Sequence, residues 1–215
     1  MKIIKSISLL LFLSFWAVGV NAQKVGAQFN ENYEKNWSFG AGFNVVDDSG
    51  EVIGGISNPS ENWNFSMPFY LSAEYYLNNE FSFIAMISTN KYQEGKVYNK
   101  AYIVDGDASY FSADLNAKFS FRDIMRSYKF DPYVFLGFGY NSIGEFKAVK
   151  KDFPYDIYES PAIGRLTINT GLGFNYWFSQ TWGMNLNLAA KLGANGNEEH
   201  NNHKQFSLGA VYFLN

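Results

Sequence analysis

The sequence predicts an all-β protein that folds as an eight-stranded antiparallel up-and-down transmembrane β-barrel. Three observations lead to this prediction. An export signal opens the chain, segments of alternating apolar and polar residues follow it, and short turns alternate with long polar loops between those segments. After the first 22 residues no stretch approaches the ~18 consecutive apolar residues of a spanning helix, so strands would have to cross the membrane.

Residues 1–22 have the features of a secretory signal peptide. Two lysines provide the positive start, residues 7–20 form the apolar stretch, and Val20-Asn21-Ala22 precedes the expected cleavage site. The apolar stretch is shorter than the ~20 residues that a spanning helix needs, which favours a cleaved signal over a membrane anchor. We therefore expect residues 23–215 to form one exported barrel domain.

Composition excludes several classes of function. The chain of 215 residues contains no Cys, which rules out disulfides, thiol nucleophiles and Cys-ligated metals. The formal net charge of −3 argues against nucleic-acid binding, which requires a basic surface. Because no cofactor motif stands out, we expect no cofactor and no nucleic-acid partner.

Eight segments alternate with the two-residue period of a strand that has two different faces. The clearest runs from Phe111 to Arg122, where apolar residues occupy every odd position and polar residues every even one. Two segments are weaker, because Ile84 and Met86 in one and Tyr133 and Phe135 in the other fall on the polar face. We interpret those two rings as tall side chains inside a small barrel. The predicted segments are 36–46, 66–77, 80–91, 109–122, 131–143, 164–178, 181–193 and 204–214.

The connections alternate in length, as they do in bacterial outer-membrane barrels. Tight or short turns are predicted at 77–80, 124–130 and 179–180. Long polar loops, crowded with turn residues, are predicted at 47–65, 92–108, 144–163 and 194–203. With both ends of the barrel domain in the periplasm, the four long loops would face outward from the cell.

A soluble β-sandwich would also alternate, with its polar face in water. Several predicted segments reach 12 or more residues, whereas soluble strands usually have ~5–6. Their polar faces carry Asn, Ser, Thr and Gly instead of Lys and Glu, and aromatic residues gather near segment ends, where membrane barrels have aromatic girdles. In hydrocarbon the sheet must also close, because every backbone polar group needs a partner.

An eight-stranded barrel is just wide enough for side chains to fill it, so inward polar groups need partners. The residues expected to form an interior polar network are Glu74, Asp114, Asn116, Lys118, Arg122, Asn169, Asn185, Asn187 and Lys191. The residues expected to face lipid are Phe111, Ala113, Leu115, Ala117, Phe119, Met184, Leu186 and Leu188. Packing is the expected role of the network, and a gate on a narrow water path is the alternative. Arg122, near the periplasmic end, could alternatively be solvated.

Glycines recur in pairs at alternate positions of three predicted strands. These pairs are Gly40 with Gly42, Gly137 with Gly139, and Gly171 with Gly173. We interpret them as inward positions that allow curvature or leave room for bulky inward rings, and a small internal pocket is the alternative.

Several short stretches carry a resemblance to a known family. They are Phe43–Gly50, Asn62–Phe65, Tyr75–Asn79, Asn90–Lys96, Tyr110–Lys118, Phe130–Tyr133, Gly137–Tyr140 and Asn169–Trp177. Together they resemble OmpA-type eight-stranded outer-membrane barrels of the Bacteroidetes lineage.

This resemblance implies an integral protein of a Gram-negative outer membrane, surrounded by membrane lipids and lipopolysaccharide and in contact with envelope proteins. The aromatic residues Tyr212 and Phe213 resemble the last strand that barrel-assembly machinery reads. Full-length members usually continue into a domain that binds peptidoglycan. Because the sequence ends at Asn215, directly after the last predicted strand, we expect that domain to be absent.

The expected function is structural or interactive, with external loops that make the contacts, and a narrow channel for small solutes or ions is an alternative. Some eight-stranded barrels instead modify lipid A and need a His beside a Ser or Asp at the outer rim. His200 and His203 lie in a predicted external loop, and Ser88, Ser109 and Ser142 lie near that rim, without a diagnostic context. The two His residues with two Glu neighbours are weak candidates for a metal site. We expect no catalytic residues and no metal.

Overall fold

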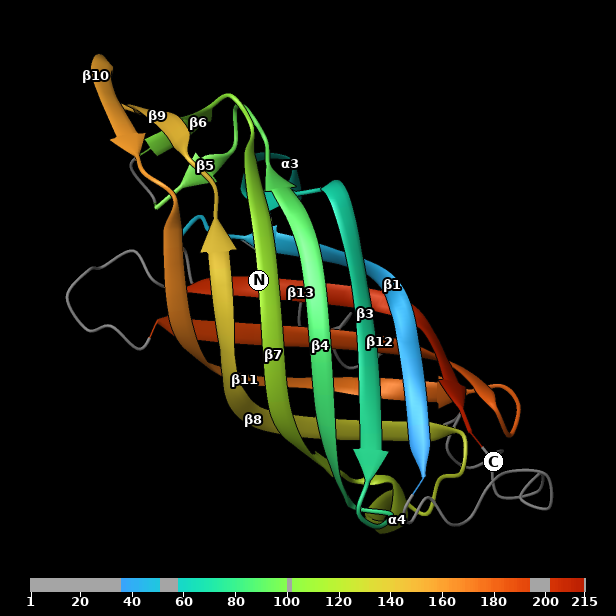
Figure 1. The fold of residues 1–215 in the computed structure, drawn as a ribbon. Coiled ribbons are helices and arrows are strands. Elements are labelled where there is room, and N and C mark those ends of the chain that lie inside the picture. The colour runs from blue at the N-terminus through green and yellow to red at the C-terminus, as the bar shows by residue number, and fades with distance from the viewer. Residues whose placement is uncertain (1–35, 51–57, 100–101, 194–201, 215) are drawn as a thin grey trace, which may run out of the picture.

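The computed structural model describes residues 36–50, 58–99, 102–193 and 202–214. Eight long strands form a closed antiparallel barrel, in which each strand pairs with both of its neighbours (Figure 1). Within the described residues no helix is long and apolar enough to cross a membrane. The predicted signal peptide, the expected domain boundary and His200 lie outside the described residues.

The predicted fold class is confirmed, and each of the eight predicted segments matches a barrel strand to within two residues at either end. Neighbouring strands pair in sequence order, and the last strand closes the barrel on the first, with Ser38 opposite Phe213 and Asp47 opposite Lys204. The barrel strands are β1 (Trp37–Asp47), β3 (Ser66–Tyr76), β4 (Phe81–Tyr92), β7 (Ala108–Ser120), β8 (Phe130–Ile143), β11 (Ile163–Trp177), β12 (Trp182–Gly193) and β13 (His203–Phe213).

Side chains alternate between the interior and the outer face along these strands. In β7 the even-numbered residues are buried and the odd-numbered ones from Ser109 to Phe119 are exposed or half-buried. The two weaker segments follow the same rule, since Met86, Tyr133 and Phe135 are buried inside the barrel. Aromatic side chains therefore occupy part of the interior.

One of the three glycine pairs, Gly171 with Gly173, makes room for those inward rings. Gly171 lies opposite Phe135, and Gly173 lies opposite Tyr133, in the pairing of β11 with β8. A Cβ atom at Gly171 would come within 2.4 Å of the Phe135 ring, and one at Gly173 within 2.6 Å of the Tyr133 hydroxyl. The interpretation as space for bulky rings is confirmed for this pair, whereas Gly40, Gly42, Gly137 and Gly139 approach backbone atoms or the side chains of Ser72, Asn116, Asp114 and Asn169.

Short turns join the strands at one end of the barrel. Asn78 closes the first turn, because its Oδ1 accepts hydrogen bonds from the backbone N–H groups of Glu80 and Phe81 at 2.9 and 2.7 Å. The second connection contains a single helical turn, α4 (Arg122–Met125), which ends at Arg126 with φ of 51°. These compact turns fit the predicted short connections.

Three of the four long connections, 47–65, 92–108 and 144–163, carry secondary structure that the sequence interpretation missed, and most of the fourth lies outside the described residues. Four of their strands form a second sheet in the order β10-β9-β6-β5, which stands beyond the barrel (Figure 1). The elements are α3 (Pro59–Asn62), β2 (Trp63–Asn64), β5 (Val97–Tyr98), β6 (Tyr102–Asp105), β9 (Phe146–Lys150) and β10 (Phe153–Ser160). Describing these stretches as polar loops was wrong, because surrounding turn residues hid the short alternation of β9.

Candidate functional site: the closed barrel interior

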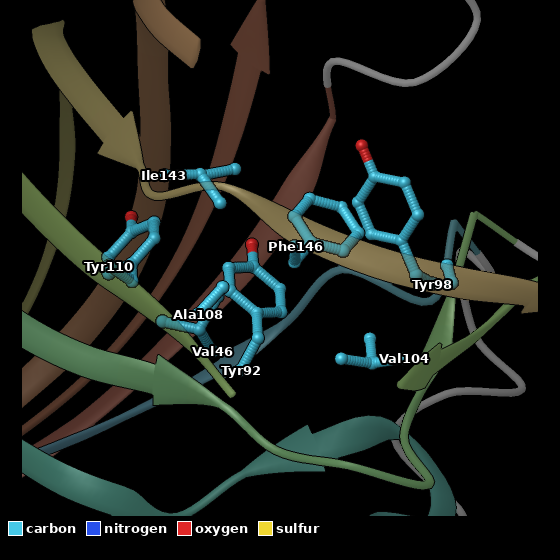
Figure 2. Close-up of a cluster of buried hydrophobic side chains, with 9 residues drawn as sticks. Val46, Tyr92, Tyr98, Val104, Ala108, Tyr110, Ile143 and Phe146 are labelled. Carbon is cyan, nitrogen blue, oxygen red and sulfur yellow. The ribbon is translucent and has the colours of Figure 1, made fainter. Parts of the chain in front are cut away.

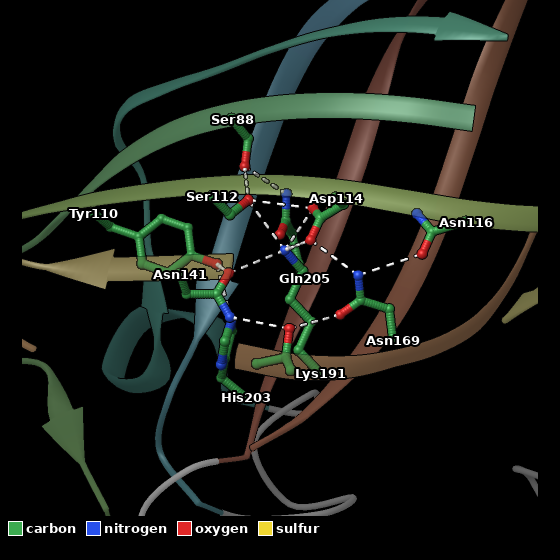
Figure 3. Close-up of polar contacts among 11 residues, drawn as sticks. Ser88, Tyr110, Ser112, Asp114, Asn116, Asn141, Asn169, Lys191, His203 and Gln205 are labelled. Carbon is green, nitrogen blue, oxygen red and sulfur yellow. Dashed lines mark hydrogen bonds and ion pairs between the residues drawn. The ribbon is translucent and has the colours of Figure 1, made fainter. Parts of the chain in front are cut away.

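An ion pair between β12 and β7 organises the half of the interior nearer the long loops (Figure 3). The Lys191 Nζ lies 2.7 and 2.9 Å from the two carboxylate oxygens of Asp114. It also donates to the Ser112 Oγ at 3.0 Å and to the Asn141 Oδ1 at 3.3 Å. The buried ammonium is thus surrounded by acceptors, as a buried charge requires.

Asn169 extends this group, called here the Lys191 cluster. Its Nδ2 donates to the Asp114 Oδ1 at 2.9 Å and to the Asn116 Oδ1 at 3.3 Å. Its own Oδ1 accepts from the Thr167 hydroxyl at 2.9 Å. Four residues of the predicted network, Asp114, Asn116, Asn169 and Lys191, therefore meet in one place.

Several members of this cluster were not predicted. The Ser88 and Ser112 hydroxyls lie 2.7 Å apart, and the Gln205 Nε2 donates to Ser88 at 3.0 Å. Ser88 and Ser112 fall on the polar faces of predicted strands, so the alternation alone could have identified them. Their uncharged hydroxyls, unlike the side chains of Lys and Asp, do not require an ionic partner when buried.

His203 was misplaced by the sequence interpretation. It is the first residue of β13, it is 4% exposed, and its Nε2 lies 2.8 Å from the Tyr110 hydroxyl inside the barrel. The loop assignment was wrong because the strand begins one residue earlier than predicted. Among the described residues no three His, Cys, Asp or Glu side chains gather where they could hold a metal ion.

A second cluster, called here the Lys118 cluster, lies nearer the short turns. The Lys118 Nζ is 2.9 Å from Glu74 and 3.5 Å from Asp131. It also lies 4.3 Å from the centre of the Tyr133 ring, at the distance of a cation–π contact. Two carboxylates and an aromatic face therefore stabilise one buried ammonium.

Amide groups complete the Lys118 cluster. The Asn175 Nδ2 donates to Asp131 at 3.2 Å, and the Ser120 hydroxyl also donates to Asp131. The Asn185 Nδ2 donates to the Asn175 Oδ1 at 2.6 Å and to the Tyr133 hydroxyl at 2.8 Å. The structure thus brings together Glu74, Lys118 and Asn185 of the predicted network.

The remaining two predicted network residues lie elsewhere. Asn187 faces a small cavity, and its buried Oδ1 has no hydrogen-bond partner among the described residues. Arg122 belongs to α4 and not to a barrel strand, so its placement in a strand was wrong. Its side chain is 1% exposed, with the Nε 3.4 Å from Asp123, which contradicts the solvated alternative.

All eight residues expected to face lipid lie on the outer face of the barrel. Phe111, Leu115, Ala117 and Met184 are exposed, and Ala113, Phe119, Leu186 and Leu188 are half-buried by outer-face neighbours. Their contact with lipid stays a prediction.

An apolar cluster fills the barrel at the long-loop end, and we call it the outer plug (Figure 2). It joins the ends of β1, β4, β7 and β8 to the loop strands β5, β6 and β9, with the Tyr98 and Phe146 rings 4.9 Å apart. Its members are Val46, Tyr92, Tyr98, Val104, Ala108, Tyr110, Ile143, Phe146 and Ala148.

The outer plug encloses a carboxyl group. The Tyr92 hydroxyl donates to the Asp48 Oδ2 at 2.8 Å, and Asp48 is 2% exposed. Burial raises the pKa of Asp48 to about 7, although the Tyr92 hydrogen bond and the nearby Arg165 charge oppose this shift. Asp48 is therefore the group in this plug whose charge depends on pH near neutrality.

A smaller apolar cluster, the inner plug, fills the short-turn end. It consists of Tyr76, Trp177, Val211 and Phe213. The Phe213 ring meets Tyr76 and Trp177 edge-on, with centroids 5.6 and 6.2 Å away. Between the plugs, the cavity beside Tyr70, Glu74 and Asn187 has about 20 Å³ of room for the centre of a water molecule. That volume suits one or two waters and no larger solute.

No protein-family model and no curated protein matches the sequence. Several solved structures match it. The outer membrane protein OprG from Pseudomonas aeruginosa has a TM-score of 0.53 at 13% identity, over 85% of this chain and 97% of that one. The fold is that of the eight-stranded outer-membrane β-barrels.

Two further structures agree with this fold. The N-terminal β-barrel domain of Pseudomonas aeruginosa OprF has a TM-score of 0.50 at 12% identity and covers 84% of this chain and 98% of its own. Neisserial surface protein A has a TM-score of 0.50 at 13% identity, over 85% and 99% of the two chains. At such low identity the likeness establishes the fold alone.

Proposed function

We propose that this protein is an integral outer-membrane barrel of a Gram-negative bacterium with a structural or interaction role, in which external loops make the contacts. The closed interior is the observation that supports this role most strongly. Aromatic plugs fill both ends, and the charged groups between them are paired with one another. The barrel therefore anchors the protein in the membrane, and the external loops that project from it make the functional contacts.

The outer face supports insertion in a membrane. Leu136, Phe138 and Leu172 are 61%, 64% and 57% exposed there, within a belt of large apolar side chains on every barrel strand. A soluble monomer rarely exposes so continuous an apolar surface. Ring pairs such as Trp37 with Tyr75 and Trp182 with Tyr212 lie at the short-turn end, as the aromatic girdle of a membrane barrel would.

The second sheet supports a role in contacts. Phe153 and Ile157 of β10 are 62% and 59% exposed beyond the barrel. The sheet holds them in place, because Tyr158 packs on Tyr102 and Lys147 pairs with Glu159 at 2.8 Å. Ordered apolar side chains at a projecting tip are typical of a site that binds an envelope protein or another surface.

We extend the proposal to the family of the protein and to the membrane that surrounds it. The chain would be an OmpA-like barrel of the Bacteroidetes type, embedded among membrane lipids and lipopolysaccharide. Barrel-assembly machinery would read β13 during insertion. Tyr212 and Phe213 at the end of that strand support this step.

A narrow channel is the second candidate, favoured by the polar lining of the interior. Current through planar bilayers distinguishes the two. We expect the purified protein to give no stable single-channel steps, because the plugs and paired charges leave no continuous passage. Stable steps that Glu74→Gln or Lys118→Met abolishes would contradict the anchor role and establish the channel.

We propose no enzymatic activity. In the described part of the chain no hydrogen bond joins Ser88 to His203, because Ser88 bonds Ser112 and Gln205 while His203 bonds Tyr110. Mass spectrometry of lipid A from cells with and without the gene checks this proposal. Identical acyl chains are expected, and a change in acylation that depends on the gene would contradict it.

The interaction role is tested by purification in mild detergent. A partner that co-purifies with the wild type should be lost from a Phe153→Ser/Ile157→Ser variant, because the substitutions remove the exposed apolar tip and leave the barrel intact. Lys151→Ser, at an exposed position in the turn of the same hairpin, is the matched control and should retain the partner. Equal recovery from both variants would contradict a role for this tip.

A further inference from the structure

The connection between β7 and β8 carries two apolar side chains on its outside. Ile124 and Met125, in the helical turn α4, are 63% and 54% exposed (Figure 1). Arg122, two residues before Ile124, is buried. Residues two positions apart in a helix point to nearly opposite sides, so Ile124 is turned away from the protein. The helical turn α4 therefore has an apolar surface of its own.

This surface continues the apolar belt of the barrel. Phe81 and Phe119 lie opposite each other on the outer face of β4 and β7, and their ring centroids are 5.0 Å apart. The Phe121 ring lies 5.1 Å from that of Phe119, and Phe121 directly precedes α4. A row of three rings thus leads from the face that we expect to contact hydrocarbon to the beginning of α4.

Contacts on both sides fix α4 at the rim of the barrel. The Asn79 Nδ2 in the first short turn donates to the Asp123 Oδ2 at 3.1 Å, and Asp123 also pairs with the Arg122 Nε at 3.4 Å. Beyond the end of the connection, the outward rings of Phe130 in β8 and Phe174 in β11 have centroids 5.2 Å apart. Aromatic rings at the rim mark the membrane–water interface of a membrane barrel, so α4 lies at that level.

The charge of this connection differs from that of the whole chain. Residues 121–129 contain three basic residues and one acidic residue, whereas the chain has a net charge of −3. The turn at 77–80 has one acidic and no basic residue, and the turn at 178–181 has neither. Asp123 is paired with Arg122, and Arg126 is exposed next to Met125. Exposed positive charge beside apolar side chains is typical of a segment that binds an anionic membrane surface.

We infer that α4 lies in the headgroup region of the periplasmic leaflet and binds an anionic phospholipid there. Ile124 and Met125 enter the boundary of the acyl chains, and the Arg126 guanidinium pairs with the lipid phosphate. The inference rests on the proposed insertion in an outer membrane. It adds a lipid site at the end of the barrel opposite the loops that make the external contacts.

Spin labels test the placement of α4. The sequence contains no Cys, so Ile124→Cys and Gln180→Cys each provide a single labelling site. Gln180 is exposed in the third short turn, at the same end of the barrel, and is the matched control. In vesicles of phosphatidylcholine and phosphatidylglycerol we expect oxygen to reach the label at 124 more readily than a water-soluble nickel chelate does. The label at 180 should show the reverse.

Equal access of the nickel chelate to both labels would overturn the inference and would leave α4 free for a periplasmic protein. Flotation of the same labelled proteins separates this outcome from failure of the proposed function. Protein that does not rise with the vesicles would contradict membrane insertion itself. Protein that rises but has a nickel-accessible label at 124 would contradict only the placement of α4.

Native mass spectrometry tests the choice of lipid. Wild-type protein released from vesicles with equal amounts of the two lipids should retain phosphatidylglycerol in preference to phosphatidylcholine. Arg126→Gln should retain roughly fivefold less phosphatidylglycerol, because one cationic side chain near the anionic surface is lost. Lys151→Gln, at an exposed position in the β9–β10 turn at the other end, should retain as much as the wild type. Equal retention by Arg126→Gln and the wild type would overturn the phosphate contact.

Discussion

Leu115 and Asn116 show at the level of single residues how the strand divides two environments. Leu115 is 44% exposed on the outer face, whereas Asn116 is buried inside and accepts a bond from Asn169. Leu115→Arg should cost ~2–4 kcal/mol of unfolding free energy if the residue lies near the bilayer midplane. Asn116→Ser should cost much less. Urea titration of both variants in lipid vesicles measures the difference, and equal costs would contradict the orientation of β7.

The pKa of Asp48 leads to a prediction about pH. Burial raises this pKa from 3.8 to about 7, so the folded protein holds the proton more tightly than the unfolded chain. The resulting stabilisation is complete below pH ~4 and is lost as pH rises through ~7. Hydrogen exchange of the Asn99 amide, which donates to the Asp48 carbonyl, reports on this region.

We therefore expect protection of the Asn99 amide, corrected for intrinsic exchange, to be greater at pH 5 than at pH 8. Tyr92 and Arg165 oppose the shift, Asp47 adds to it, and Tyr98 and Tyr110 also lie close enough to interact with the Asp48 charge. Asp48→Asn should remove the pH dependence while it keeps the size of the side chain. The same pH profile in wild type and Asp48→Asn would show that another group is responsible.

The sequence predicted charged interior residues better than neutral ones. Glu74, Asp114, Lys118 and Lys191 could be placed inside because a charge on an alternating strand must be either solvated or paired. The contacts of Gln205 with Ser88 and of His203 with Tyr110 were not predicted, since each joins strands that are far apart in the chain. The register between neighbouring strands decides which interior side chains form hydrogen bonds or ion pairs with one another. This register cannot be read from the sequence of any one strand.

At the level of elements, the pairing of β11 with β8 explains the Gly171–Gly173 pair and allows a test. A Cβ atom at Gly171 would lie 2.2 Å from the Leu188 carbonyl oxygen and 2.4 Å from the Phe135 ring. Because these atoms belong to β12 and β8, on either side of β11, a shift of β11 away from one strand would not relieve both contacts. Gly171→Ala should cost ~1–3 kcal/mol of stability through overpacking. Thr170→Ala on the exposed outer face is the neighbouring control and should cost much less. Comparable unfolding midpoints for the two variants would contradict the tight fit between β11 and β8.

Strands with two distinct faces were predictable, and short strands in loops were not. The eight barrel strands separate an apolar surface from a polar interior, which imposes alternation over 11 to 15 residues. β5 and β6 have only two and four residues. They hold a strand conformation because Tyr98 and Val104 pack in the outer plug. Val97–Tyr98 shows no period that would distinguish it from the surrounding turns, so only the tertiary contacts of Tyr98 with Tyr92 and Phe146 reveal it.

The whole molecule combines an apolar exterior, a closed polar interior and an ordered sheet beyond one end. Each feature depends on closure, because an open sheet would expose backbone groups to hydrocarbon and leave Lys118 and Lys191 without their partners. We therefore expect the barrel to be inserted in a lipid bilayer.

Flotation with lipid vesicles tests that central claim most directly. Purified protein corresponding to residues 23–215, folded in the presence of vesicles, should rise with the lipid in a density gradient. It should stay with the lipid after alkaline carbonate washing, because the belt around Leu136, Phe138 and Leu172 is held by hydrocarbon. A folded monomer that remains soluble in detergent-free buffer and never rises with the vesicles would contradict the account.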